Sequence, residues 1–204
     1  ISVQRNVATG VVGTFGGGVR ISHGSVLLIE NKTTGLIAEN TAFNGGGMGI
    51  GISSGDNSSL VVRGVDTTVI VANNTASSHA GGIFVWSSFS IDAGASIDVH
   101  NNKASQSSQG VCAQSFNALL TVSGARTRMV VSASNNGGLG INGGTLIVKE
   151  GAYLKSCKNM GQQGGGMHLT GASVKIEGAR THVVVQQNTA FAAGGIWLFR
   201  GSQL

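Results

Sequence analysis

The sequence predicts an all-β fold, a right-handed parallel β-helix (β-solenoid) with three strands per coil. Three observations support this: a glycine-led phrase recurs at nearly fixed spacing, short alternating apolar stretches fill each interval, and the composition suits stacked strands. The chain has 204 residues, with 34 glycines, no proline and 41% hydrophobic residues. Only 10% of residues are charged, so the composition excludes intrinsic disorder, and the lack of a Gly-X-Y period excludes collagen.

The recurring phrase is a glycine followed by an apolar residue, any residue and a second apolar residue. Its seven copies begin at Gly18, Gly47, Gly82, Gly110, Gly138, Gly166 and Gly195. The spacings are 29, 35, 28, 28, 28 and 29 residues. Because side chains alternate between the two faces of a strand, both apolar positions of each phrase are predicted to face a core. The spacing predicts six to seven coils of about 28–29 residues.

Each interval holds two further apolar stretches, which are rich in β-branched residues and bounded by Gly, Asn and Ser, as is typical of strands. The second strands are predicted at residues 27–29, 60–62, 89–91, 120–122, 146–148 and 174–176. The third strands are predicted at residues 36–38, 69–71, 97–99, 129–131, 154–156 and 183–185. One coil cannot close a core alone, whereas stacked coils share one apolar interior. We therefore expect one solenoid domain over residues 1–204, with the right hand that parallel crossovers usually adopt.

An Asn-x-Ala motif precedes most of the glycine phrases, and the coil that ends at Gly138 lacks it. A stacked asparagine can hydrogen-bond the backbone of its own turn and of the next, and it tolerates left-handed geometry. The motif therefore predicts a structural ladder of asparagines along the rod. Its members are Asn40, Asn74, Asn102, Asn159 and Asn188.

The Asn-x-Ala motif followed by a glycine pair and an apolar residue, as at Gly81-Gly82-Ile83 and Gly194-Gly195-Ile196, resembles the repeats of pectin-lyase-like parallel β-helix proteins. Within that group it is most similar to the passenger regions of polymorphic-outer-membrane-protein-type autotransporters, although the FxxN motif of those passengers is absent. The resemblance covers the whole chain. It implies either a surface-exposed rod for adhesion or display or a scaffold for carbohydrate enzymes, and the fold alone does not choose between them.

No catalytic constellation is predicted. Glycoside hydrolysis usually needs two carboxylates roughly 5–10 Å apart, and Asp92 and Asp98, which share a coil, fall on different strands. The five histidines have no metal-ligand spacing, and the glycine runs are not followed by a helix that could cradle a phosphate. Cys112 and Cys157 lie in different coils, so no disulfide is expected between them. We expect no enzyme activity, no cofactor and no metal in this segment.

The middle residue of each first strand, and the residue two positions further on, are predicted to point outward. This places both tryptophans of the chain on one face, in two aromatic pairs that we expect to be exposed: Phe84 with Trp86 and Trp197 with Phe199. Exposed aromatic side chains on a flat strand face suit docking to another protein or to a sugar ring. The alternative is that a loop or flanking sequence covers them.

Charge is distributed unevenly along the chain. Residues 1–100 carry four Lys or Arg and six Asp or Glu, a net charge of −2, whereas residues 101–204 carry nine and two, a net charge of +7. Arg126, Tyr153 and Arg180 are expected at equivalent turns of successive coils, which would place the ring between two guanidinium groups. With Arg128 and His182 nearby, this edge is a candidate site for an anionic polysaccharide or an acidic protein surface. The alternative is a solvated basic edge without a ligand.

Three N-x-S/T sequons mark candidate glycosylation sites, at Asn31, Asn57 and Asn73. Asn57 is the best candidate, because it lies in the predicted loop of the longest interval, and glycosylation there would fit a secreted rod.

Neither end of the sequence has the pattern of a cap, and an open end coil exposes unpaired backbone. We therefore expect either continuation of the same chain or end-to-end self-association. The leading hypothesis is a non-catalytic extracellular structural or adhesive rod: a scaffold, an adhesin segment or a filament subunit. The alternative is a carbohydrate-binding or polysaccharide-processing β-helix whose active residues lie outside this segment. Another surface protein or a polysaccharide is a possible partner. Nucleic acid is not expected, and no apolar run reaches the roughly 20 residues of a membrane span.

Overall fold

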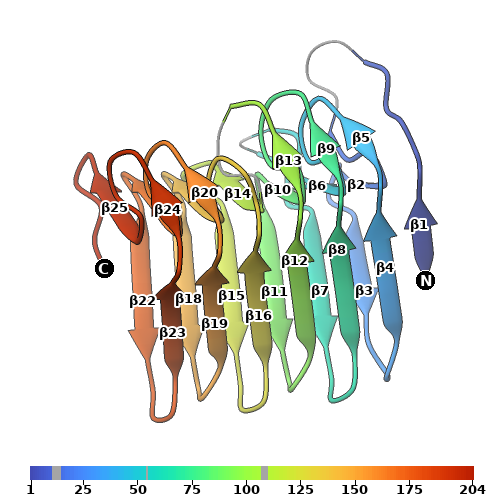
Figure 1. The fold of residues 1–204 in the computed structure, drawn as a ribbon. Helices are drawn as coiled ribbons and strands as arrows, with labels where there is room; N and C mark the ends of the chain where they lie inside the picture. Colours follow the sequence, from blue (N-terminus) through green and yellow to red (C-terminus); the bar gives the residue numbers. More distant parts are fainter. Residues whose placement is uncertain (11–14, 54, 107–109) are drawn as a thin grey trace.

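The computed structural model describes residues 1–10, 15–53, 55–106 and 110–204, and over them the chain winds into a parallel β-solenoid of about six turns of about 29 residues. Successive coils lie side by side, and the colour of the chain changes steadily from the N-terminus at one end of the rod to the C-terminus at the other (Figure 1). The predicted class of fold, its coil length and its three main sheets are confirmed.

Three long parallel sheets form the sides of the solenoid. Sheet 1 consists of β2 (Val19–Ile21), β6 (Met48–Ile50), β10 (Ile83–Val85), β14 (Val111–Gln114), β17 (Leu139–Asn142), β21 (Met167–Thr170) and β25 (Ile196–Phe199). Sheet 2 consists of β3 (Val26–Ile29), β7 (Ser59–Arg63), β11 (Ser88–Asp92), β15 (Leu119–Ser123), β18 (Thr145–Lys149) and β22 (Ser173–Glu177). Sheet 3 consists of β1 (Ser2–Gln4), β4 (Thr34–Ala38), β8 (Thr68–Ala72), β12 (Ser96–His100), β16 (Arg128–Ser132), β19 (Tyr153–Cys157) and β23 (His182–Gln186).

Pairing follows the sequence repeat: each strand lies beside the equivalent strands of the coils before and after it. Ile83, for example, pairs with Met48 on one side and Val111 on the other. The short Asn-x-Ala segments, which we did not predict as strands, also pair between coils. They form β5 (Thr41–Ala42), β9 (Thr75–Ala76), β13 (Lys103–Ala104), β20 (Met160–Gly161) and β24 (Thr189–Ala190). These two-residue strands lack an apolar alternation, which is why the sequence pattern did not indicate them.

The core is one continuous apolar column inside the three sheets. Each coil contributes alternate residues of its strands, such as Ile50 from sheet 1, Leu60 from sheet 2 and Val71 from sheet 3, all of them fully buried. The remaining strand residues point outward, so every functional surface of the rod is built from the intervening positions and from the turns.

The asparagines form a ladder of hydrogen bonds inside the turn that follows sheet 3. Asn74 donates its backbone N–H and its Nδ2 to Oδ1 of Asn102, at 3.0 Å each, and its own Oδ1 accepts the equivalent pair from Asn40. Asn159 donates in the same way to Asn188. In the coil that lacks the motif, Ser134 occupies the position and donates its backbone N–H to Oδ1 of Asn159. Ser134 thus keeps the backbone link to the following coil, although it contributes no amide side chain to the ladder.

Candidate functional site

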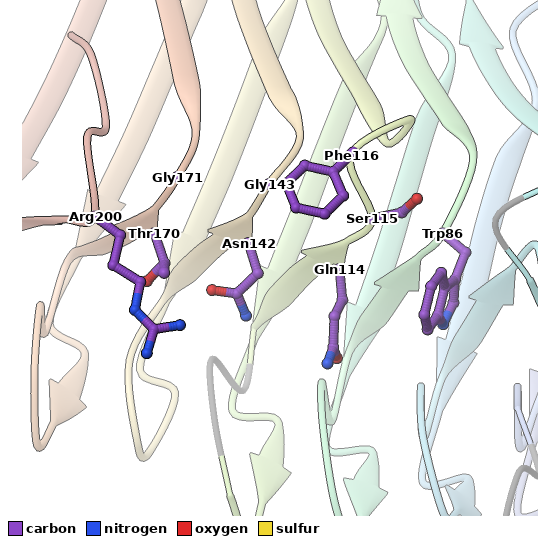
Figure 2. A pocket seen from close by; sticks show the side chains of 9 residues that line it. All are labelled: Trp86, Gln114, Ser115, Phe116, Asn142, Gly143, Thr170, Gly171 and Arg200. Atoms are coloured by element: carbon purple, nitrogen blue, oxygen red, sulfur yellow. The ribbon is translucent and has the colours of Figure 1, made fainter.

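A groove of about 600 Å³ runs along the outer face of sheet 1 across the later coils. Four of its lining residues occupy one position, the residue that follows the second core residue of the strand: Trp86, Gln114, Asn142 and Thr170. The register pairs Gln114 with Asn142 and Asn142 with Thr170. Because parallel coils repeat about every 4.8 Å, these side chains form a regular row along the rod axis. Figure 2 shows Gln114 and Asn142 projecting from neighbouring strands between Trp86 and Arg200.

Phe116 forms one wall of the groove. It follows β14 in a turn, its side chain is 88% exposed, and its ring lies over Gly143 of the next coil (Figure 2). A Cβ atom on Gly143 would lie 2.9 Å from Cδ1 of this ring, and Gly143 has a φ of +81°. Glycine is therefore required here by backbone conformation and by the close approach of the aromatic ring.

Arg200 lies at the end of the groove opposite Trp86 (Figure 2). Its guanidinium carbon lies 5.2 Å from the centroid of the Phe199 ring, a cation–π geometry that orients the arginine. Arg200 is exposed, and the residues that line the groove within the described part of the chain include no Asp or Glu. The groove thus combines aromatic surface at Trp86 and Phe116, amides and a hydroxyl along its floor, and one positive charge.

The prediction that Phe84 is exposed is wrong. Phe84 does point away from the solenoid core, but only 1% of its surface is exposed because Phe15 and His79 cover it. The ring centroids of Phe84 and Phe15 are 5.4 Å apart, and those of Phe84 and Trp86 are 6.1 Å apart. The outward face of β10 therefore carries a second, small apolar cluster, in which Phe84 packs against Trp86. The spacing of the motif could not reveal this, because Phe15 comes from another coil.

The second aromatic pair has a different environment. Trp197 is partly exposed and Phe199 is 48% exposed, as the alternation predicted for both. Trp197 pairs in register with His168, whose pKa is lowered by burial. His168 lies within 3.2 Å of the hydroxyl of Thr170 in the groove.

Sequence reasoning missed Gln114, Phe116, Asn142 and Arg200 as candidate site residues. The alternation along the first strands already placed Gln114 and Asn142 on the outward face, but nothing in the sequence distinguished their amides from other exposed polar side chains.

The candidate anion-binding edge is arranged differently from the prediction. Tyr153 pairs in register with Arg128 on one side and His182 on the other, not with Arg126 and Arg180. The guanidinium carbon of Arg128 lies 5.7 Å from the centroid of the Tyr153 ring. An arginine therefore does stack on Tyr153, but it is Arg128 and not Arg126 or Arg180.

The reason is a difference in the length of the turns between sheets 2 and 3. The turn before Tyr153 has one residue fewer than the turns before Arg128 and His182, and it lacks the position that Arg126 and Arg180 occupy. Both arginines adopt a left-handed conformation, with φ of 67° and 61°. Because one shorter coil separates them, they lie about 10 Å apart along the axis and are both exposed to solvent. Arg126 and Arg180 are therefore separate positive charges on this edge and do not form a continuous row.

The side chains of Asn31, Asn57 and Asn73 are all exposed, so each candidate glycosylation site is accessible. Both cysteines are buried. The described residues contain no group of three or more His, Cys, Asp or Glu side chains placed to hold a metal ion. Nor do they form a helix with the length and hydropathy needed to cross a membrane.

The fold and the groove define the chain as a parallel β-solenoid that carries an aromatic and amide-lined groove on one side. The sequence matches no family model and no curated protein, and the structure matches no solved structure. The fold is therefore the level at which this chain can be classified.

Proposed function

We propose that this chain is a non-catalytic, extracellular adhesive rod that binds a carbohydrate chain along the groove of sheet 1. The observation that carries the proposal is the row of Trp86, Gln114, Asn142 and Thr170, with Phe116 beside it and Arg200 at its end. The resemblance to the repeats of pectin-lyase-like and autotransporter passenger proteins supports a rod that is displayed at a cell surface.

The chemistry of the groove suits an extended sugar polymer. Aromatic rings offer apolar faces against which sugar rings can stack. Amides and hydroxyls can both donate and accept hydrogen bonds, as sugar hydroxyls require. Since the row repeats about every 4.8 Å over several coils, it can contact successive units of one extended chain. The charge at Arg200 favours a ligand with an anionic group at that end.

The composition of the lining supports binding without hydrolysis. A glycosidase of the usual kind uses two carboxylates on opposite sides of the scissile bond. The described lining residues include two amides, Gln114 and Asn142, and no carboxylate. The alternative, a polysaccharide-processing protein whose active residues lie outside this segment, would use the same groove as a holding site.

The proposal is tested with Phe116→Ala and a panel of neutral and acidic oligosaccharides, with affinity measured by calorimetry. Phe116 is 88% exposed and packs on Gly143, so its removal should leave the fold intact. For the best ligand of the panel we expect about a tenfold loss of affinity, or about 1.4 kcal/mol.

The matched control is Phe191→Ala, because Phe191 is 97% exposed and is not part of the groove lining. This variant should bind as tightly as the unmodified protein. Equal affinity of all three proteins, or no binding of any oligosaccharide, would contradict the proposed function. Release of shorter products by the unmodified protein would favour the processing alternative.

A further inference from the structure

The outer face of sheet 3 carries two unpaired charges of opposite sign. The third residues of its five-residue strands lie in register and form one row, the middle row: Leu36, Ile70, Asp98, Val130, Lys155 and Val184. Four members are apolar, and Asp98 and Lys155 stand on either side of Val130. Figure 1 shows the strands of this sheet on the near side of the rod, with no other described segment across them.

Asp98 is poorly satisfied within its own chain. Its Oδ1 is buried and has no hydrogen-bond partner among the described residues. The carboxylate borders a hollow of about 200 Å³, whose lining includes Thr68, Ile70 and Arg128. Arg128 does not fill this need, because its guanidinium stacks on the Tyr153 ring. A buried carboxylate oxygen without a partner costs free energy, and a cationic group in the hollow would lower that cost through the attraction between opposite charges.

Lys155 is the complementary group, but it lies two coils from Asp98 on the same chain. The two residues are separated by Val130, so they are about 10 Å apart along the rod axis. Lys155 takes part in no ion pair within the described part of the chain. Each charge is thus free to meet a group on another molecule.

We propose that two copies of this chain pair face to face through sheet 3, with their rod axes antiparallel, about a two-fold axis that passes through Val130. A two-fold axis along the strand direction reverses the order of the coils in the second copy. It also places each row of outward residues opposite the equivalent row of the other copy. Val130 then meets its own copy, Asp98 meets Lys155 of the other chain, and Ile70 meets Val184. The lysine enters the hollow beside Asp98, and the same contact occurs twice.

The other two-fold arrangement fails on charge. Rods paired in parallel would place equivalent coils opposite each other, which brings the two Asp98 carboxylates together and the two Lys155 ammonium groups together. In the antiparallel arrangement the like pair is Arg128 with its copy. These arginines are exposed at the edge of the face, where water screens them and each is stacked on Tyr153.

The expected dimer is weak and depends on salt. Five overlapping strands of five residues present a flat area of about 400 Å² on each copy, which places the interface among small, transient ones. The contact uses sheet 3 alone, so the groove on sheet 1 stays accessible in the dimer. The inference is therefore independent of the proposed ligand.

The test is sedimentation equilibrium at low salt, over protein concentrations up to several hundred micromolar. The unmodified protein should dimerise, Asp98→Lys alone and Lys155→Asp alone should each weaken dimerisation at least tenfold, and the double variant should restore it. The double variant is diagnostic because reversing both charges recreates both contacts. A monomer at all concentrations, single variants that associate normally, or a double variant no better than the singles would overturn the proposal.

A second measurement checks the position of the axis. Val130→Cys should be joined into a covalent dimer by a short bismaleimide cross-linker, which can span the roughly 10 Å between two face-to-face sheets, because the axis brings the two copies of this position together. Leu36→Cys is the matched control, since it lies in the same row but overhangs the partner when the axis passes through Val130. Faster cross-linking of Leu36→Cys than of Val130→Cys would overturn the proposed register.

Discussion

Asn74 links three coils through one side chain. It is fully buried, its Nδ2 also donates to the backbone carbonyl of Ile37 at 3.0 Å, and its Oδ1 accepts from both nitrogens of Asn40. Removal of the amide would take these partners from two backbone groups, the carbonyl of Ile37 and the N–H of Asn40. At the scale of single residues, the stability of the rod therefore depends on polar groups that satisfy each other between coils.

Asn74→Ala should lower the free energy of unfolding by about 2–4 kcal/mol, because buried donors and acceptors would lose their partners. Chemical denaturation monitored by circular dichroism measures this change. Ser77→Ala, at an exposed position in the same turn, is the control and should change stability by less than about 0.5 kcal/mol. A loss below about 1 kcal/mol for Asn74→Ala would show that the ladder is not a main source of stability.

The carboxylate of Asp56 holds the loop of the longest repeat interval, between Gly47 and Gly82, through hydrogen bonds. This carboxylate accepts hydrogen bonds from the backbone N–H groups of His23, Gly24, Ile52 and Ser58 and from the Ser58 hydroxyl. Burial alone would raise the pKa of the carboxyl group, but the Ser58 hydroxyl and the backbone donors outweigh it and lower the pKa.

Because the folded-state pKa of Asp56 is below the unfolded value of about 3.9, its contribution to stability is complete above pH 4. The contribution is lost as the pH falls from there through the lowered pKa. Asp56→Asn should therefore cost about 1 kcal/mol at pH 7 and weaken the dependence of melting temperature on pH below pH 4. A variant that melts in parallel with the unmodified protein from pH 7 to pH 2 would disprove this role.

At the scale of elements, the turns decide the shape of the groove. The turn that contains Gly143 permits the ring of Phe116, from the preceding coil, to lie flat against the backbone. A side chain at this position would move the ring and would also strain a left-handed residue. These two effects are separable, because Gly24 has a similar φ of +75° with no heavy atom within 4 Å of an added Cβ.

Gly143→Ala should weaken the binding of the best oligosaccharide about as much as Phe116→Ala does, and it should destabilise the fold by about 1–2 kcal/mol. Gly24→Ala carries the backbone strain alone and should leave binding unchanged. Calorimetry and thermal melting of the two variants measure both effects. Normal binding by Gly143→Ala would mean that the position of Phe116 does not matter to the ligand.

At the scale of the whole molecule, the solenoid assigns separate roles to separate sides. Sheet 1 carries the groove, and sheet 3 carries the self-complementary row of Asp98, Val130 and Lys155. Sheet 2 carries a ladder of charges in which Arg63 pairs with Glu30 at 2.6 Å and Lys149 with Glu150 at 3.0 Å. These exposed pairs add little stability individually. One rod can therefore bind a ligand and a second copy of itself through different sides.

The sequence by itself determined the repeat, the strands of the three main sheets and the core residues of the inner coils. In the last coil, the predicted inward residues Ile176 and Leu198 are 46% and 49% exposed. It could do so because a strand exposes side chains with a period of two and because each coil must bury the same positions. The Asn ladder followed from the same repeat, although Ser134 replaces one member. These properties depend on the local pattern alone.

Only the tertiary structure decided which outward residues meet. The cover of Phe15 over Phe84, the packing of Phe116 on Gly143 and the stacking of Arg128 on Tyr153 all join residues from different coils. Such contacts depend on the number of residues in each turn, because one residue more or fewer changes which side chains share a row. The pattern of a strand specifies the face of a residue, whereas its neighbours on that face come from the stacking of coils.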